Sequence, residues 1–180
     1  KENHFNTATF MNLSQYILSI PDFPKLGIEF FDITPLMANP EAYKYTIEKM
    51  SELIEPTNPT KIMAAESRGF FFGPAIALAM HLPFVPIRKK GKLPRETINI
   101  EYQLEYGTDT LCVHKDDICA DDRLVVLDDI LATGGTAEAM CKMAERVEAK
   151  IACCAFFMEL GFLKGRERLN NRTVVSMFVK

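Results

Sequence analysis

The run from Arg123 to Thr136 constrains this chain more than any other feature. It starts with an almost unbroken apolar segment, Arg123 to Leu127, typical of a strand buried on both faces of a parallel sheet. Two carboxylates, Asp128 and Asp129, follow where we expect that strand to end. A Thr-Gly-Gly-Thr turn then leads into a predicted helix, Ala137 to Lys150, with helically spaced apolar residues. The run therefore predicts an α/β unit with a ligand beyond the carboxyl end of the strand.

The turn has the chemistry of an anion site. Gly134 and Gly135 let the backbone approach a ligand, and the free N–H groups of the next helix, its dipole and the hydroxyls of Thr133 and Thr136 suit a phosphate. The two aspartates lie too near that anion to bind it, so we expect them to serve sugar hydroxyls and a developing cation. These residues indicate a phosphorylated ribose activated at its anomeric carbon. The alternative is a plain strand–turn–helix with ordinary turn residues.

Length, composition and charge are those of a single globular domain. With 180 residues, 48% hydrophobic and 25% charged, the chain can bury a continuous core. Its net charge of −3 argues against general nucleic-acid binding, and no apolar stretch reaches transmembrane length. The segment from Lys1 to Thr9 lacks the apolar core of a signal peptide, and the five cysteines form no C-x-x-C. We expect reduced thiols and a cytoplasmic protein that binds neither nucleic acid nor membrane.

Strand and helix patterns alternate along the chain, which predicts an α/β fold with right-handed crossovers. The predicted helices are Asn12 to Ile20, Pro40 to Ile54 with Asn39 as N-cap, and Gly69 to Met80. The predicted parallel strands are Lys61 to Ala65, Phe84 to Ile87, Arg123 to Leu127 and Ile151 to Met158. Thr97 to Tyr102 and Leu111 to His114 predict a projecting antiparallel hairpin.

The Asp-Asp and Thr-Gly-Gly-Thr string resembles the phosphoribosyl-diphosphate signature of the type I phosphoribosyltransferases. It is neither a Gly-x-Gly-x-x-Gly fingerprint nor a Walker loop. Other segments, spread over Ile20 to Leu169, resemble the adenine-specific members of that family. They are Pro21-Asp-Phe-Pro24, Gly27-Ile-Glu-Phe-Phe-Asp32-Ile-Thr-Pro35, Glu66-Ser67-Arg68-Gly69-Phe70, Arg88-Lys-Lys-Gly-Lys92-Leu-Pro94, Leu104-Glu105-Tyr106-Gly107 and Leu163-Lys-Gly-Arg-Glu167.

The resemblance implies the type I phosphoribosyltransferase fold: a mainly parallel sheet flanked by helices, a projecting catalytic hairpin and a small N-terminal hood. It implies one domain over residues 1–180, with a base-covering hood at 1–36 and a mobile lid at 90–107. The implied reaction transfers the 5-phosphoribosyl group of phosphoribosyl diphosphate to adenine, giving AMP and diphosphate through an oxocarbenium-like state.

The resemblance assigns the ribose and its 5′-phosphate to the opening run. Asp128 and Asp129 are expected to bind the ribose hydroxyls and to favour positive charge on the sugar. Otherwise they are only charges near a helix N-terminus, worth less than ~1 kcal/mol. The 5′-phosphate is expected on Ala132, Thr133, Gly134, Gly135 and Thr136.

Diphosphate is expected at basic residues and close backbone. By resemblance Ser67 and Arg68 form a turn, often with a cis peptide, and Arg88, Lys92 and Tyr106 contact the diphosphate. We favour Arg88 over Lys89 because side chains alternate along an extended segment. The basic stretch from Arg88 to Arg95 is otherwise a solvated loop.

The lid is expected to exclude water, with Gly91 and Gly107 as pivots. By resemblance Glu105 exchanges a proton with adenine N7, and a carboxylate in a closing, drier site gains a raised pKa and can donate a proton. Glu101 is a second candidate. Without the motif, both glutamates are expected to be merely solvated.

Adenine is expected between two apolar faces, Phe30 and Ile130, with backbone near Glu29 reading its edge. Phe30 and Phe31 are otherwise core aromatics. Phe31 stands where the family often has arginine, and Glu66 where aspartate is common. Magnesium is the expected cofactor, carried mainly by the substrate rather than by direct protein ligands.

A homodimer is expected from the very apolar segment Gly69 to Met80. Its aromatics Phe70, Phe71 and Phe72 cannot all face one core from a helix, and related enzymes pair through this region.

Two other functions fit parts of the pattern. A transferase for a 6-oxo purine would need a hydrogen-bond donor at the edge of the base, often a lysine. The segment before the last predicted strand contains Lys150 but no clear residue for reading the base. A non-catalytic regulator of this fold would carry an added DNA-binding region, and the segment before Pro21 is short and not basic.

Overall fold

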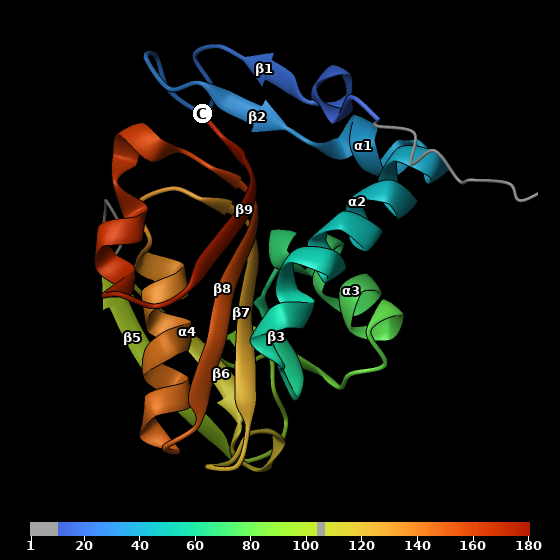
Figure 1. The fold of residues 1–180 in the computed structure, drawn as a ribbon. Helices are drawn as coiled ribbons and strands as arrows, with labels where there is room; N and C mark the ends of the chain where they lie inside the picture. Colours follow the sequence, from blue (N-terminus) through green and yellow to red (C-terminus); the bar gives the residue numbers. More distant parts are fainter. Residues whose placement is uncertain (1–10, 104–106) are drawn as a thin grey trace, which may run out of the picture. The chain divides into compact units, whose positions relative to one another are not determined.

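The structure, a computed structural model, describes residues 11–103 and 107–180 (Figure 1). The chain divides into two compact units, Lys1–Thr46 and Ile47–Lys180. In the first unit, the 3₁₀ helix η1 (Leu13–Tyr16) precedes β1 (Leu18–Ile20), β2 (Phe30–Asp32) and α1 (Thr34–Ala38). Helix α2 (Pro40–Ile54) begins in this unit and ends in the second.

The predicted helix from Asn12 to Ile20 is wrong in its second half. Asn12 caps only a short turn, its side-chain oxygen accepting from the Ser14 amide at 3.1 Å. The chain then becomes β1, which pairs antiparallel with β2, Leu18 opposite Asp32 and Ile20 opposite Phe30. Pairing with β2, the next strand along the chain, therefore overrides the local pattern.

Helix α2 confirms its predicted bounds. Asn39 Oδ1 accepts a hydrogen bond from the Ala42 amide at 3.0 Å, and Pro40 takes the first helical position, where no backbone donor is needed.

The second unit contains a sheet that, within the described residues, has seven strands. The strands are β3 (Lys61–Ala65), β4 (Phe84–Lys89), β5 (Thr97–Gln103), β6 (Thr108–His114), β7 (Arg123–Leu131), β8 (Lys150–Glu159) and β9 (Val174–Val179). Their order is β5-β6-β4-β3-β7-β8-β9. The pairs β3–β4, β3–β7, β7–β8 and β8–β9 are parallel, whereas β4–β6 and β5–β6 are antiparallel. The predicted mainly parallel sheet with a hairpin is confirmed; β9 was not predicted.

Helices cover both faces of this sheet. Helix α4 (Gly135–Arg146) lies on one face and α3 (Gly73–Ala79) on the other (Figure 1). The centre of β7, Leu124 to Leu127, is 0% exposed, as expected for a strand between two layers. Each such side chain contributes roughly 1.5–3 kcal/mol of transfer free energy. The core therefore fixes the strand whose end carries the aspartates.

Two predicted boundaries are wrong. The segment predicted as one helix from Gly69 to Met80 is a 3₁₀ turn, η3 (Arg68–Phe71), followed by the separate helix α3, with Pro74 in its first turn. Strand β7 continues through Asp128 and Asp129 to Leu131, so the aspartates lie within a strand rather than after it. Helix α4 starts at Gly135 and ends at Arg146, earlier at both ends than predicted.

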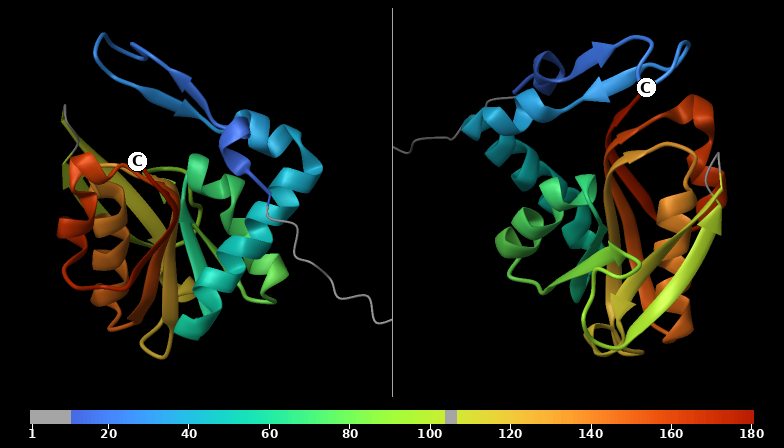
Figure 2. Two further views of the ribbon diagram at one scale, coloured as in Figure 1. Left: turned by 45° about the horizontal axis from the view of Figure 1, so that its top comes forward. Right: turned by 180° about the vertical axis from the view of Figure 1, so that it is seen from behind.

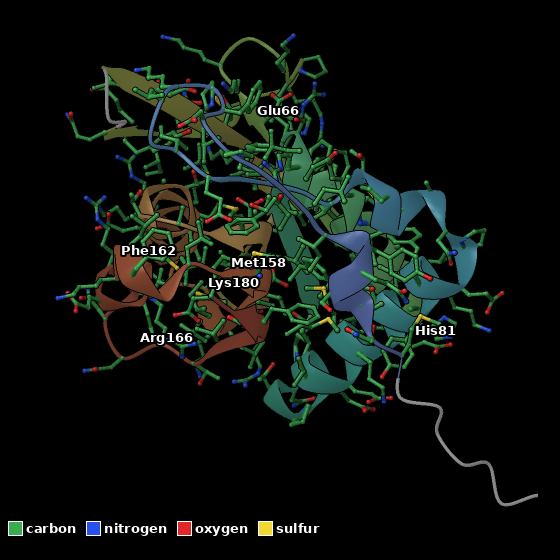
Figure 3. All side chains as sticks on the ribbon, turned by 90° about the horizontal axis from the view of Figure 1, so that it is seen from above. Glu66, His81, Met158, Phe162, Arg166 and Lys180 are labelled. Atoms are coloured by element: carbon green, nitrogen blue, oxygen red, sulfur yellow. The ribbon has the colours of Figure 1, made fainter. Side chains whose placement is uncertain are left out.

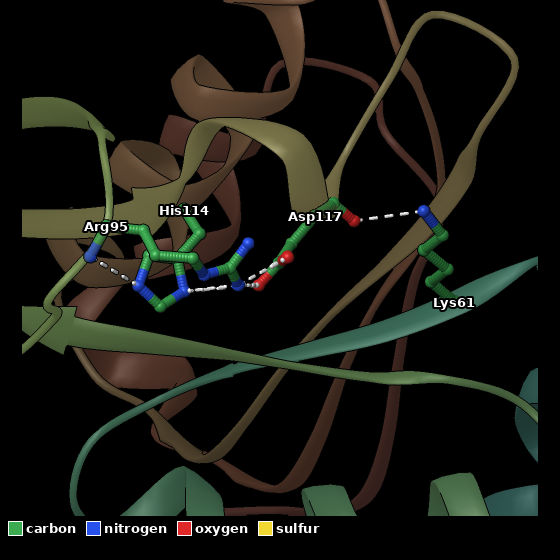
Figure 4. A network of polar contacts seen from close by, with 4 residues as sticks. All are labelled: Lys61, Arg95, His114 and Asp117. Atoms are coloured by element: carbon green, nitrogen blue, oxygen red, sulfur yellow. Dashed lines mark hydrogen bonds and ion pairs between the residues drawn. The ribbon is translucent and has the colours of Figure 1, made fainter.

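The hairpin β5–β6 forms the edge of the sheet beside α4 (Figure 2). Its root is held by a polar network (Figure 4). The Arg95 guanidinium lies 2.9 Å from both His114 Nδ1 and Asp117 Oδ1, and the Asp117 carbonyl accepts from Lys61 Nζ at 2.9 Å. The network joins the hairpin to β3, and Arg95 is engaged at the hairpin root.

Within the described residues, no helix combines the length and apolar character needed to cross a membrane. All five cysteines are free thiols.

Candidate active site

The candidate site lies at the carboxyl end of the parallel sheet, where β3, β4 and β7 end side by side. Glu66, Ser67 and Arg68 follow β3, Arg88 lies at the end of β4, and the aspartates lie in the last part of β7. Figure 3 looks onto this end of the sheet and labels Glu66. Pairing of β7 with β3 ends at Leu127, and β7 then continues beside β8. Because β3 ends before the aspartates, residues of η3 rather than of a strand lie on that side of them.

The two aspartates have different surroundings. Asp129 is 5% exposed, and its Oδ2 lies 2.5 Å from Arg68 Nε, a charge contact without hydrogen-bond alignment. Asp128 Oδ1 accepts from the Asp129 amide at 2.9 Å. Burial, and then the neighbouring Asp129 carboxylate, raise the pKa of Asp128 well above its usual value. Arg68 therefore balances the charge of Asp129, whereas the surroundings of Asp128 disfavour its ionised form.

Gly69 brings η3 close to this pair. A Cβ atom at Gly69 would lie 3.2 Å from Asp128 Oδ1 and 3.3 Å from the Leu127 carbonyl oxygen, tighter than most such contacts. The structure places a non-proline cis peptide between Glu66 and Ser67, one bond before the Ser67–Arg68 dipeptide where the resemblance implied it.

Sequence reasoning gave no role to Glu66, which the structure places in contact with the end of β4. Its Oε1 accepts from the Lys89 amide at 2.5 Å, and its Oε2 lies 3.2 Å from Arg88 Nε. The carboxylate therefore ties the end of β3 to the end of β4 and fixes the predicted diphosphate arginine. The sequence does place an acidic residue after one predicted strand and basic residues after the next, and this pattern could have predicted the contact.

Two of the basic residues after Arg88 have different surroundings. Lys89 Nζ forms an ion pair with Asp109 Oδ2 at 3.0 Å, and that hydrogen bond raises the pKa of Lys89. Lys92 is exposed on the following turn, where its amide donates to the Lys89 carbonyl at 3.2 Å. Glu105 and Tyr106 lie outside the described residues.

The predicted phosphate loop, Ala132 to Gly134, links β7 to α4. Gly134 has φ +84°, a left-handed conformation that glycine adopts without strain, and it caps the helix. Its carbonyl accepts from the Glu138 amide at 2.9 Å. Thr133 is exposed, and the Thr136 side chain is hydrogen-bonded to Tyr102 of β5, a bond that opposes the rise in the pKa of Tyr102 caused by burial. The free amides of the first α4 turn suit an anion.

The predicted adenine residues are divided between the units. Ile130 is half-buried in β7, opposite Met158 of β8. Phe30 and Glu29 belong to the first unit, where Phe30 packs edge-on against Phe23 with ring centroids 5.1 Å apart. Phe31, where the family often has arginine, is 5% exposed and is a core residue.

Comparison with known proteins decides the family. A sequence model described as "Phosphoribosyl transferase domain" matches residues 33–179. The chain belongs to the phosphoribosyltransferase family.

Relatives within the phosphoribosyltransferases share an adenine-specific name. The adenine phosphoribosyltransferase of Maridesulfovibrio salexigens is 50% identical over 93% of this chain and 98% of its own length. The adenine phosphoribosyltransferase structure from Thermoanaerobacter pseudethanolicus aligns with a TM-score of 0.90 at 43% identity, covering 93% of this chain and 98% of that one. The Saccharomyces cerevisiae enzyme, solved with adenine and an imino-altritol bisphosphate, aligns with a TM-score of 0.85 at 40% identity, covering 91% of this chain and 95% of its own. The resemblance drawn from the sequence segments is confirmed.

Proposed function

We propose that this protein transfers the 5-phosphoribosyl group of phosphoribosyl diphosphate to adenine, producing AMP and diphosphate. The observation that carries the proposal is the pair Asp128 and Asp129 in the last part of β7, which a short loop joins to the glycine-capped helix α4. Carboxylates close to the start of a helix suit a ligand that carries sugar hydroxyls beside a phosphate. The chain's similarity to adenine phosphoribosyltransferases, one of them solved with adenine, favours adenine as the acceptor.

The chemistry follows from charge. The loop Ala132 to Thr136 binds the 5′-phosphate, and the aspartates bind the ribose hydroxyls. As the C1–O bond lengthens, positive charge grows on the sugar, and an ionised Asp128 stabilises it. Arg68 already balances Asp129, so the pair need not hold two uncompensated charges before the sugar arrives.

Diphosphate leaves toward the basic side of the site. Arg88, fixed by Glu66, and Ser67 and Arg68 of the turn receive it, with Lys92 and Tyr106 supplied by the lid segment. We expect Phe30 and Ile130 each to contact adenine, the backbone near Glu29 to read its edge, and Glu105 to manage the proton at N7.

Magnesium fits this site as a substrate-borne ion. Within the described part of the chain, no three His, Cys, Asp or Glu side chains gather as a metal cluster. The available oxygen donors are Asp128 and Asp129, beside the diphosphate and ribose hydroxyls that magnesium prefers. When bound, the ion neutralises charge on the leaving diphosphate.

A panel of bases tests the proposal. Purified protein with phosphoribosyl diphosphate and magnesium is expected to form AMP from adenine at least ~10²-fold faster than nucleotide from hypoxanthine or xanthine, because a site that hydrogen-bonds an amino group leaves that acceptor unpaired against an oxo base. Chromatography of the products gives the rates. Preference for a 6-oxo base would make this a different purine transferase, and no product with any base would favour the regulator.

We propose that the protein is a homodimer. Two of the three aromatics that suggested it pack inside this chain. Phe72 is fully buried and stacks on Phe157 with ring centroids 5.3 Å apart, and Phe70 packs against Phe84 with ring centroids 5.6 Å apart. The support now comes from α3, where Leu78 is 78% exposed. Light scattering at micromolar concentration is expected to give twice the chain mass, and a monomer mass would contradict the proposal.

A reducing compartment suits this chain. Cys112, Cys141, Cys153 and Cys154 are buried free thiols and Cys119 is an exposed one. Exposed thiols persist where the environment is reducing, so we place the protein in the cytoplasm.

A further inference from the structure

The segment from Gly161 to Leu169 has no part in the proposed chemistry, although it contains the Leu163-Lys-Gly-Arg-Glu167 pattern. It follows β8 as two 3₁₀ turns, η5 (Gly161–Leu163) and η6 (Gly165–Leu169). Gly165 is buried in it. A Cβ atom at Gly165 would lie 2.2 Å from the Ala132 carbonyl oxygen and 3.1 Å from the Ala132 carbonyl carbon. The Gly165 backbone is therefore packed directly against Ala132, the first residue of the phosphate loop.

The contact is reciprocal. A Cβ atom at Gly134 would lie 2.6 Å from the Gly165 carbonyl oxygen. Gly134 also needs glycine for its left-handed backbone, whereas Gly165 does not have positive φ. At Gly165 the requirement for glycine is therefore one of space: any side chain there would displace the Ala132 backbone.

The segment is anchored on its other side. Arg166 Nε donates to Glu159 Oε1 at 3.0 Å and Nη2 to Oε2 at 2.5 Å, while Nη1 donates to the Val174 carbonyl at 3.2 Å. Glu159 is 6% exposed and also accepts from Ser176 Oγ at 3.0 Å. Figure 3 labels Arg166 on this C-terminal part of the ribbon. A two-pronged contact between arginine and a buried carboxylate is strong and geometrically specific. The segment is thus fixed to β8 and β9.

We propose that Gly165, held in place by Arg166, is a positioning residue for the 5′-phosphate loop. The segment packs against the Ala132 and Gly134 backbone and holds it in the position in which the amides of the loop and of the first α4 turn converge on one anion. Gly165 itself does not touch the substrate; it sets the position of Ala132 and Gly134. This inference rests on the assignment of the 5′-phosphate to this loop.

Gly165→Ala tests the inference by adding one methyl group. The KM for phosphoribosyl diphosphate is expected to rise about 10- to 100-fold, because misplaced amides lose charge-assisted hydrogen bonds to the phosphate. The kcat at saturation and the KM for adenine are expected to stay within about threefold, since ground-state donor binding is what changes. Ribose 5-phosphate binding, measured by calorimetry, is expected to weaken in parallel.

Gly161→Ala is the matched control in the same segment. A Cβ atom there would lie 3.3 Å from the carbonyl oxygen of the exposed Lys180, which can move slightly, so donor kinetics are expected to stay unchanged. A Gly165→Ala protein with a wild-type donor KM would overturn the inference. So would an equal loss of kcat and of affinity for both substrates, which indicates general damage.

Arg166→Gln keeps the inference testable if Gly165→Ala does not fold. It removes the ion pair with Glu159 without adding bulk, and a severalfold rise in the donor KM alone is expected; unchanged kinetics would refute the inference. Failure of the proposed function is distinguishable, because it shows in the wild-type protein as a preference for another base. The donor KM comparison can then be made with that base.

Discussion

Asp128→Asn is expected to lower kcat about 10²- to 10³-fold, the usual effect of removing one well-placed charge partner of a transition state. The structure adds a second expectation, that the melting temperature of the substrate-free protein rises at pH 7. Burial and the Asp129 carboxylate raise the pKa of Asp128, so ionising this group costs stability. Asparagine removes the charge but keeps an oxygen to accept the Asp129 amide.

The pH dependence follows with a definite sign. Because the folded pKa of Asp128 lies above its unfolded value near 4, the native state binds more protons than the unfolded state between the two values. The free energy of unfolding therefore falls as pH rises through that window, and this contribution should vanish in the variant. Thermal melts across pH, with the exposed Asp116→Asn as control, check it. Near wild-type AMP formation by Asp128→Asn would refute the assignment of the ribose site.

Glu105→Gln is expected to retain both substrates but to lose about 10²- to 10⁴-fold in kcat, the usual contribution of general acid–base catalysis. Glutamine keeps the size and a hydrogen bond but cannot exchange a proton with adenine N7. Steady-state kinetics with adenine, together with direct binding of AMP, separate turnover from affinity.

Glu101→Gln is the control for this variant. Glu101 lies on β5 opposite Thr110, in an outer groove with Lys142 and Arg146 of α4, so its replacement should be mild. If Glu101→Gln is the impaired protein instead, the proton donor is misassigned. If neither change matters, the proton passes through solvent and the lid only excludes water.

Periodicity predicted most of the fold because its strands are buried on two faces. Lys61 to Ala65 and Arg123 to Leu127 had to be apolar throughout, and such runs are legible in a sequence. The end of β7 was not legible, because acidic residues usually stop a strand. Here Asp128 pairs with Phe156 of β8, while Asp129 finds its charge partner in Arg68 of η3. Strand β9 was missed because its residues are only half-buried and its partner β8 is reached through a long connection.

The site was predictable where one segment carries the chemistry and not where two segments meet. Asp128, Asp129 and the Thr-Gly-Gly-Thr turn are contiguous, so their shared role could be read from the sequence. Glu66 acts on Arg88 and the Lys89 amide of another strand, and Gly165 acts on Ala132 from beyond β8. Both lie in segments that resemble the family, yet the sequence alone does not say what they touch.

The continuation of β7 through the aspartates has a consequence for dynamics. Asp128, Ile130 and Leu131 keep their pairing with β8 rather than lying in a loop, although the pairing of β7 with β3 has already ended at Leu127. Amides of this part of β7 that bond to β8 are expected to exchange with deuterium only when the β7–β8 pairing opens, whereas those of β5, at the sheet edge, exchange through local opening. The carboxylates should therefore keep their spacing through repeated cycles of catalysis, and exchange of the β7 amides that bond to β8 should scarcely change when ligands bind.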